Sequence, residues 1–136
     1  MRNGGKVLFC GNGGSATDAL HLAGEFVGKF QRERRSIPAI ALNANVASLT
    51  AIANDYEYDF VFSRAVEGLM KPEDVLVAIS TSGNSKNVLQ AVRKAEEIGG
   101  KSISILGYDG GNIKEATDLA IVVPDDCTAR IQDLTS

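Results

Sequence analysis

The densest group of polar side chains follows an apolar run at residues 75–79. Residues 80–85 read Ser-Thr-Ser-Gly-Asn-Ser and carry four hydroxyl groups, whereas a helix N-cap requires only one. Placed between a strand and a helix, such a loop directs hydroxyls and backbone N–H groups toward the positive end of the helix. We therefore expect an anion site here, with phosphate as its ligand. The alternative is a plain turn in which Ser85 serves only as the N-cap.

The loop lacks the Gly-Lys-Ser/Thr order of a nucleotide P-loop. Hydroxyls and amides without that lysine suit a sugar phosphate better than a metal-bound triphosphate. The hydroxyls expected to hold the phosphate are those of Ser80, Thr81, Ser82 and Ser85.

A second loop, at residues 11–15, is rich in glycine and with Ala16 formally matches the dinucleotide pattern Gly-x-Gly-x-x-[Gly/Ala]. A dinucleotide fold also needs an acidic residue at the end of the second strand, for the ribose. Residues 42–45 read Leu-Asn-Ala-Asn there. We therefore expect no nucleotide cofactor, and glycines that let backbone N–H groups approach another ligand.

The only histidine, His21, lies four residues before Glu25, so the two side chains share one face of a helix, with Asp18 beside them. By the helical period this face points about 180° away from an apolar stripe. That stripe comprises Ala19, Leu20, Ala23, Phe26, Val27 and Phe30. The pair is then either a solvated contact, which the spacing alone favours, or a catalytic base with its partner or two metal ligands. A catalytic role would require a second subunit to enclose the pair.

Apolar periodicity predicts strands that alternate with helices along the chain. The predicted strands are 6–10, 37–42, 75–79, 102–106 and 119–123, and the predicted helices are 16–30, 44–52, 59–70, 87–98, 113–117 and one that begins near 128. This alternation predicts an α/β fold, a three-layer αβα sandwich around a doubly wound, five-stranded parallel sheet of the flavodoxin-like kind. In the strand order 2-1-3-4-5, the two polar loops meet at the switch point where ligands bind.

Composition limits the possible partners. The 136 residues suffice for one domain, and the net charge of −3 argues against a nucleic-acid partner. Cys10 and Cys127 lack metal-ligand spacing and are expected to be reduced thiols of a cytoplasmic protein, with Cys10 a small core residue. No apolar stretch reaches 18 residues, so no membrane partner is expected.

Taken together, these segments resemble a SIS (sugar isomerase) domain and, more narrowly, the phosphoheptose isomerase family. The motifs that carry the resemblance are residues 11–15, 18–25, 53–55, 80–85, 107–111 and 129–132, in the family's order and over almost the whole chain. The serine loop marks SIS domains in general. The His-x-x-x-Glu helix is the narrower signature.

The resemblance implies a homotetramer with its sites at subunit interfaces. Besides the serine loop, it implies that the substrate is held by Asn12, Gly13, Gly14, Glu25, Asn54, Asp55 and Gln132. Glu25 would be the base that moves a proton between the first two sugar carbons through an enediol. A zinc ion would be bound by His21, Glu25 and Gln132.

The implied activity is the conversion of sedoheptulose 7-phosphate to D-glycero-D-manno-heptose 7-phosphate in envelope heptose synthesis. The alternative is a non-catalytic SIS module that binds a phosphosugar or a replication-initiation protein; Glu25 favours the enzyme. We expect residues 1–136 to be a single SIS domain truncated at both ends. The family's second catalytic histidine would fall after Ser136, so we expect the chain alone to lack full activity.

Overall fold

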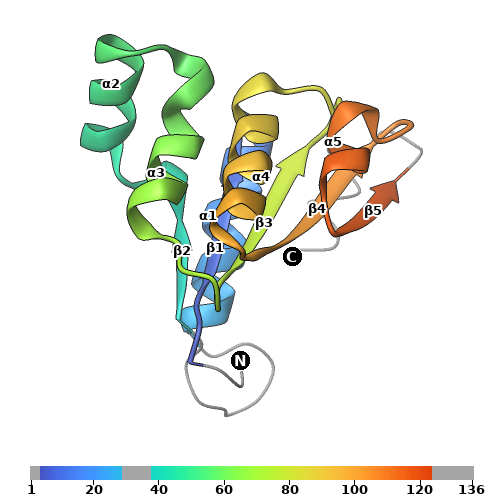
Figure 1. Ribbon diagram of the computed structural model, residues 1–136, viewed down its shortest axis with the longest axis horizontal. Coiled ribbons are helices and arrows are strands. Elements are labelled where there is room, and N and C mark those ends of the chain that lie inside the picture. Colours follow the sequence, from blue (N-terminus) through green and yellow to red (C-terminus); the bar gives the residue numbers. More distant parts are fainter. Residues whose placement is uncertain (1–3, 29–37, 124–136) are drawn as a thin grey trace.

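Parallel strands alternate with helices in the computed structural model, which describes residues 4–28 and 38–123 (Figure 1). The strands of the described ranges are β1 (Val7–Gly11), β2 (Ala39–Ala41), β3 (Val75–Ser80), β4 (Lys101–Gly107) and β5 (Leu119–Val123). The α-helices are α1 (Gly14–Val27), α2 (Val46–Asp55), α3 (Val61–Leu69), α4 (Lys86–Ile98) and α5 (Gly111–Ala116), and two short 3₁₀ turns are η1 (Leu42–Ala44) and η2 (Tyr58–Phe60). The strands form one parallel sheet in the order β2-β1-β3-β4-β5, which confirms the predicted fold class and strand order.

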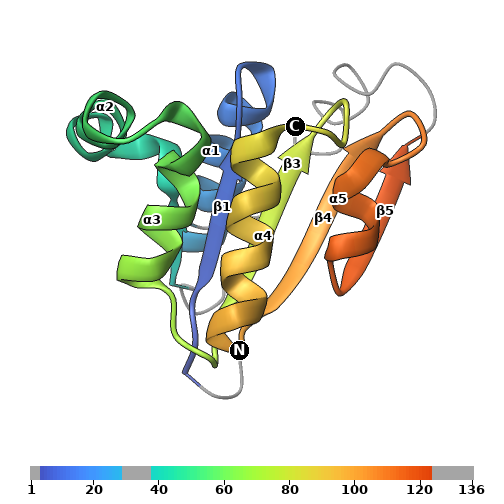
Figure 2. The same ribbon diagram turned by 45° about the horizontal axis from the view of Figure 1, so that its top comes forward.

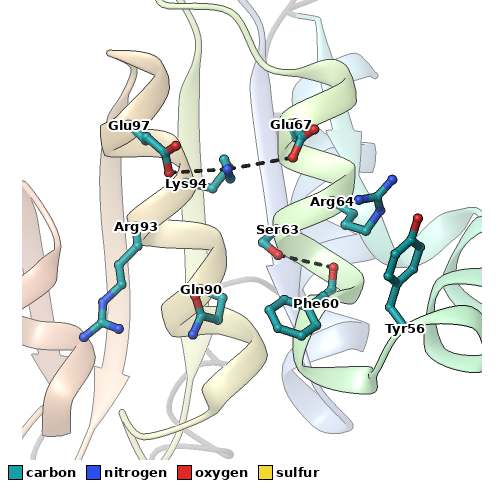
Figure 3. Close-up of a pocket in the computed structure, with 9 residues that line it drawn as sticks. All are labelled: Tyr56, Phe60, Ser63, Arg64, Glu67, Gln90, Arg93, Lys94 and Glu97. Carbon is teal, nitrogen blue, oxygen red and sulfur yellow. Dashed lines mark hydrogen bonds and ion pairs between the residues drawn. The ribbon is translucent and has the colours of Figure 1, made fainter.

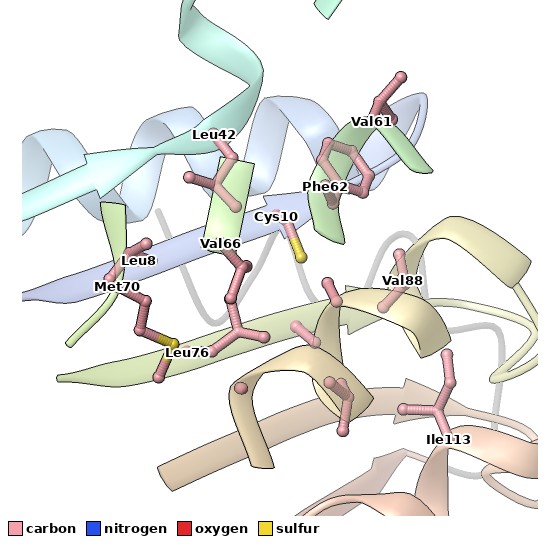
Figure 4. Close-up of a cluster of buried hydrophobic side chains, with 14 of the residues drawn as sticks. Leu8, Cys10, Leu42, Val61, Phe62, Val66, Met70, Leu76, Val88 and Ile113 are labelled. Carbon is pink, nitrogen blue, oxygen red and sulfur yellow. The ribbon is translucent and has the colours of Figure 1, made fainter. Parts of the chain in front are cut away.

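Helices cover both faces of the sheet. In Figures 1 and 2, α1 lies behind the strands, while α3, α4 and α5 lie in front of them. Alternate residues of β1 serve the two faces, as the pleat of a strand requires: Leu8 and Cys10 pack toward α3 and α4, and Val7 and Phe9 pack toward α1. Figure 4 shows the cluster on the α3 and α4 side, where Phe62 and Leu76 are fully buried.

The face that α1 covers is only partly closed by the described residues. The ring of Phe26 on α1 meets that of Phe9 edge-on, with 5.3 Å between their centroids. Farther along the sheet, however, Leu119 and Ile121 of β5 are 56% and 46% exposed. An apolar strip on β5 therefore stays open to solvent within residues 4–28 and 38–123.

The predicted packing stripe of α1 was wrong at two positions. Leu20 and Val27 are 46% and 49% exposed. Only a narrow strip of the helix surface packs on the sheet, and these two side chains lie outside it. The residues that pack toward the sheet are Ala19, Leu22, Ala23 and Phe26, spaced at i, i+3, i+4 and i+7. Phe30 and the helix predicted to begin near residue 128 lie outside the described residues.

Other element boundaries differ from the prediction by a few residues. α2 begins at Val46, because the side chain of Asn45 accepts a hydrogen bond from the Ser48 N–H at 3.0 Å and so caps the helix. It ends at Asp55, three residues beyond the predicted end at residue 52 and at the position where the break was expected. The helix predicted over 59–70 is divided into η2 and α3.

Two expectations from composition concern Cys10 and the membrane. Cys10 is fully buried in β1, and this burial raises the pKa of its thiol to about 12. The thiol therefore stays protonated, and the prediction of a small core residue is confirmed. Cys127 lies outside the described residues. Within the described ranges, none of the helices combines the length and the hydrophobicity needed to cross a bilayer.

A buried ion pair joins the start of β1 to the turn before β3. The carboxylate of Asp74, which is 2% exposed, accepts hydrogen bonds from the Lys6 ammonium at 2.6 Å and from the backbone N–H groups of Lys6 and Lys71, each at 2.8 Å. Burial by itself would raise the pKa of Asp74, but the Lys6 and Lys71 bonds outweigh it and hold the pKa below its usual value of 3.8.

Replacing Asp74 with Asn should lower the free energy of unfolding at pH 7 by about 2 kcal/mol, because charge-assisted hydrogen bonds are lost at a buried position. A carboxyl whose pKa is lowered by folding stabilises the protein above its unfolded pKa, and this contribution disappears as the pH falls through the folded value. Urea unfolding of both proteins at neutral pH and below pH 3.8 checks this. A difference in stability that stays constant between the two pH values would contradict it.

Candidate functional site

Two loops meet at the carboxyl edge of the sheet. The glycine turn (residues 11–15) follows β1, and the serine loop (residues 80–85) follows β3. β1 and β3 are paired so that Gly11 lies opposite Ile79, and the two loops therefore leave the sheet side by side. The predicted meeting of these loops at the switch point is confirmed.

The glycine turn is held by a side chain of η1, the 3₁₀ turn that follows β2, and leads directly into α1. Gly13 precedes the helix with φ of +56°, a value that favours glycine, and its carbonyl accepts the N–H of Ala16 at 3.0 Å. The side chain of Asn43 donates to the Gly11 carbonyl at 2.7 Å. Asn43 thus stands where a dinucleotide fold would place its ribose-binding acid, and it braces the turn instead.

Hydroxyls of the serine loop are bonded to the loop itself. Ser80 is 2% exposed, and its hydroxyl lies 3.0 Å from that of Ser85 and accepts the Gly83 N–H at 3.1 Å. The hydroxyl of Ser82 accepts the Asn84 N–H at 3.0 Å. Ser85 occupies the N-cap position of α4, but its side chain makes no capping bond to the helix. Ser85 is therefore not a side-chain cap, and the N-terminus of α4 has none. Anion binding by the loop stays a prediction.

The first turn of α5, which follows β4, holds the serine loop in place. The Gly83 carbonyl accepts the Ile113 N–H at 2.9 Å, and the Asn84 side chain accepts the Asn112 N–H at 2.9 Å. Gly83 has φ of +73°, and a Cβ atom there would overlap the carbonyl of Gly110. The serine loop is consequently a rigid element whose shape depends on a glycine at position 83.

His21 and Glu25 lie on the outward face of α1, as their spacing predicted. His21 Nε2 is 3.4 Å from Glu25 Oε1, and the two side chains are 42% and 30% exposed. Asp18 lies beside them, one turn before His21, as predicted, but unlike them it is buried, with 3% of its surface exposed. Burial raises the pKa of Asp18, although the nearby His21 offsets part of this rise.

The His21–Glu25 pair has a spacing that one metal ion could bridge. Tetrahedral zinc with bonds of about 2.0–2.1 Å separates its ligand atoms by about 3.3 Å, close to the 3.4 Å between these two side chains. In the described ranges no cluster of three or more His, Cys, Asp or Glu side chains is able to hold a metal. Gln132, the third expected ligand, lies outside those ranges. The pair therefore fits two positions of a metal site.

Asn54 and Asp55 are the last residues of α2, and both are exposed. Their side chains contact each other, with 3.3 Å between Asn54 Nδ2 and Asp55 Oδ1. Three residues further, the Tyr58 hydroxyl donates to Asn12 Oδ1 at 2.9 Å. This bond brings the segment after α2 to the glycine turn, at the same edge of the sheet.

Two residues of this edge were missed from the sequence. Asn87 in the first turn of α4 is 3% exposed, and its amide pairs with that of Asn12. Tyr58 completes the group. An asparagine at the start of an amphipathic helix gives no local signal, because its partner lies 75 residues away in the chain.

A separate groove of about 350 Å³ lies between α3 and α4 (Figure 3). Lys94 sits within it, 3.3 Å from Glu97 and 3.8 Å from Glu67, and the guanidinium of Arg64 stacks 4.2 Å from the Tyr56 ring centroid. The residues that line it are Tyr56, Phe60, Ser63, Arg64, Glu67, Gln90, Arg93, Lys94 and Glu97. It includes none of the predicted site residues.

Comparison with known proteins agrees with this geometry. A family model described as the SIS domain matches residues 1–107. A phosphoheptose isomerase from a Nitratiruptor species is 55% identical over 134 residues, 98% of this chain and 72% of the relative. One from Helicobacter pylori is 54% identical over 134 residues, 98% of this chain and 70% of the relative.

Solved structures show the same likeness. A phosphoheptose isomerase from Francisella tularensis superposes with a TM-score of 0.90 at 39% identity, over 98% of this chain and 72% of that one. The corresponding enzyme from Neisseria gonorrhoeae gives 0.88 at 47% identity, over 98% and 71%. The fold and the family model define the chain as a SIS domain, and its identity to these relatives shows that it belongs to the phosphoheptose isomerase family.

Substituting Gly83 with Ala should lower the free energy of unfolding by roughly 1–3 kcal/mol, because the residue would be strained at positive φ and would press on Gly110. Gly68→Ala is the matched control. Gly68 is exposed in α3 with open space around an added Cβ, so this change should stabilise the protein by about 0.5–1 kcal/mol. Thermal unfolding of both variants checks the pair. Equal stability of the two would contradict the rigid-loop account.

Proposed function

We propose that the protein is an aldose–ketose isomerase that converts sedoheptulose 7-phosphate to D-glycero-D-manno-heptose 7-phosphate. The observation that carries this proposal is the convergence of the glycine turn and the serine loop at one edge. Glu25 lies near the other end of α1, about 16 Å along the helix from the glycine turn, so the Glu25 that acts on the bound sugar would come from another copy of the chain. Relatives that share more than half of their residues with this chain are named phosphoheptose isomerases. This favours the enzyme over a non-catalytic module.

The phosphate group would bind at the serine loop. Ser82 is exposed and Ser85 half-buried, so both hydroxyls are within reach of a ligand, and the uncapped N-terminus of α4 adds N–H donors and a positive dipole end. Ser80 would act mainly by holding the Ser85 hydroxyl in place. A contact from Thr81 stays a prediction.

The sugar would extend from the phosphate toward α1. Glu25 takes a proton from the first carbon of the open-chain ketose and returns it to the second carbon, while the hydroxyl proton of the first oxygen passes to the second through the enediol. The imidazole of His21 lies next to this carboxylate and restricts its orientation. Contacts from Asn12, Gly13, Gly14, Asn54 and Asp55 would hold the chain of sugar hydroxyls.

A zinc ion would be held by His21, Glu25 and Gln132. The 3.4 Å spacing of the first two side chains supports this assignment. When bound, the metal would act as a Lewis acid on the sugar oxygens. Elemental analysis should find zinc in the wild-type protein and less in His21→Ala; equal content in both would remove His21 from the ligands.

We also propose a homotetramer whose subunits close the site. Leu20 and Val27, 46% and 49% exposed, leave apolar surface on α1 outside the part that packs on the sheet. A second copy seated on this surface would shield Glu25 from water. Sedimentation equilibrium should give four times the chain mass, and a monomer would contradict the proposal.

The cytoplasmic location stays a prediction.

Glu25→Gln should reduce isomerisation at least about 100-fold, because the amide cannot accept the carbon-bound proton. In deuterated water, the wild-type protein should yield heptose 7-phosphate that carries deuterium at its second carbon, as read by proton NMR. Glu96→Gln, at an exposed glutamate of α4, is the control and should behave as wild type.

Two results would contradict the proposal. Deuterium uptake that survives Glu25→Gln would remove this residue from the mechanism. A protein that includes the residues expected after Ser136 and that binds sedoheptulose 7-phosphate without converting it would favour the non-catalytic module.

A further inference from the structure

Two asparagine side chains form a reciprocal pair across the site. Asn12 Nδ2 donates to Asn87 Oδ1 at 2.8 Å, and Asn87 Nδ2 donates to Asn12 Oδ1 at 2.9 Å. One asparagine belongs to the glycine turn and the other to the first turn of α4, immediately after the serine loop. The pair therefore ties together the two loops that would hold the sugar phosphate.

Tyr58 adds a third member from a distant part of the chain. Its hydroxyl donates to Asn12 Oδ1 at 2.9 Å, although the residue itself is 51% exposed. The carbonyl oxygen of Asn12 now accepts two hydrogen bonds, which occupies both of its lone pairs. One hydrogen on Asn12 Nδ2 remains outside the network.

This arrangement determines whether Asn12 can offer a ligand a hydrogen-bond donor or an acceptor. A free asparagine side chain can turn over and offer a ligand either its oxygen or its nitrogen. With its oxygen saturated by Asn87 and Tyr58, Asn12 can offer only an N–H donor. Asn87 is almost fully buried, so breaking the pair would leave polar atoms buried without hydrogen-bond partners.

We propose that Asn87 and Tyr58 are positioning residues, which lock the Asn12 amide so that it donates a hydrogen bond to an oxygen of the sugar phosphate. The inference rests on the proposed function, since it takes Asn12 as a substrate contact. It assigns roles to two residues that do not themselves touch the substrate. It also predicts that their effect on binding passes entirely through Asn12.

A double-mutant cycle tests this dependence. Binding of sedoheptulose 7-phosphate is measured by calorimetry in the full chain carrying Glu25→Gln, so that no turnover interferes. Tyr58→Phe should weaken binding roughly three- to tenfold when Asn12 is present and should have no further effect in Asn12→Ala. Affinity for inorganic phosphate should stay within about twofold, because the serine loop is untouched.

Tyr56→Phe is the matched control. This tyrosine lies two residues away with similar exposure, and its ring contacts Arg64 without touching Asn12. It should bind the sugar phosphate as the parent does. Asn87→Leu, which keeps the volume but removes both amide bonds, should weaken binding more than Tyr58→Phe does.

Several outcomes overturn the proposal. An equal loss from Tyr58→Phe with and without Asn12, or no loss at all, would show that Tyr58 does not act through Asn12. A parallel loss of phosphate affinity would point to general disruption of the loops. Failure of the proposed function looks different. Binding of sedoheptulose 7-phosphate without conversion would contradict the isomerase but leave the role of Asn12 testable, whereas no binding by the protein with its native Glu25 would contradict both proposals.

Discussion

The parallel pairing of β1 with β3 is the constraint on which the site depends. With Gly11 opposite Ile79, both strands end at the same level, and each must pass its chain into a helix on a different face of the sheet. The two connections therefore diverge beyond the ends of the strands and leave a space at the carboxyl edge of the sheet. Only a register of this kind brings a turn near residue 12 beside a loop near residue 82.

The site has a rigid end and an open end. At the serine loop, Ser80 and Gly83 are buried, and the hydrogen bonds are made within the loop or to the first turn of α5. On the outer face of α1, His21 and Glu25 are partly exposed. Preorganised donors suit the binding of a phosphate that does not react, whereas a base on an exposed face works best when a second copy of the chain encloses it.

Much of this could be predicted from the sequence, because the main signals are local. The β-branched run before Ser80, the glycines before α1 and the four-residue spacing of His21 and Glu25 each determine structure over a few residues. The failures have a common cause. A broad apolar stripe does not reveal which part of a helix meets the sheet, so Leu20 and Val27 were assigned to the core. The pairing of Asn12 with Asn87 across 75 residues depends on tertiary structure and left no pattern.

A crystal structure of the protein with sedoheptulose 7-phosphate tests the central claim most directly. The account predicts that the phosphate lies within hydrogen-bond distance of the Ser82 and Ser85 hydroxyls at the start of α4. It also predicts that the first two sugar carbons lie next to a Glu25 carboxylate. A phosphate bound elsewhere, with the serine loop empty, would contradict it.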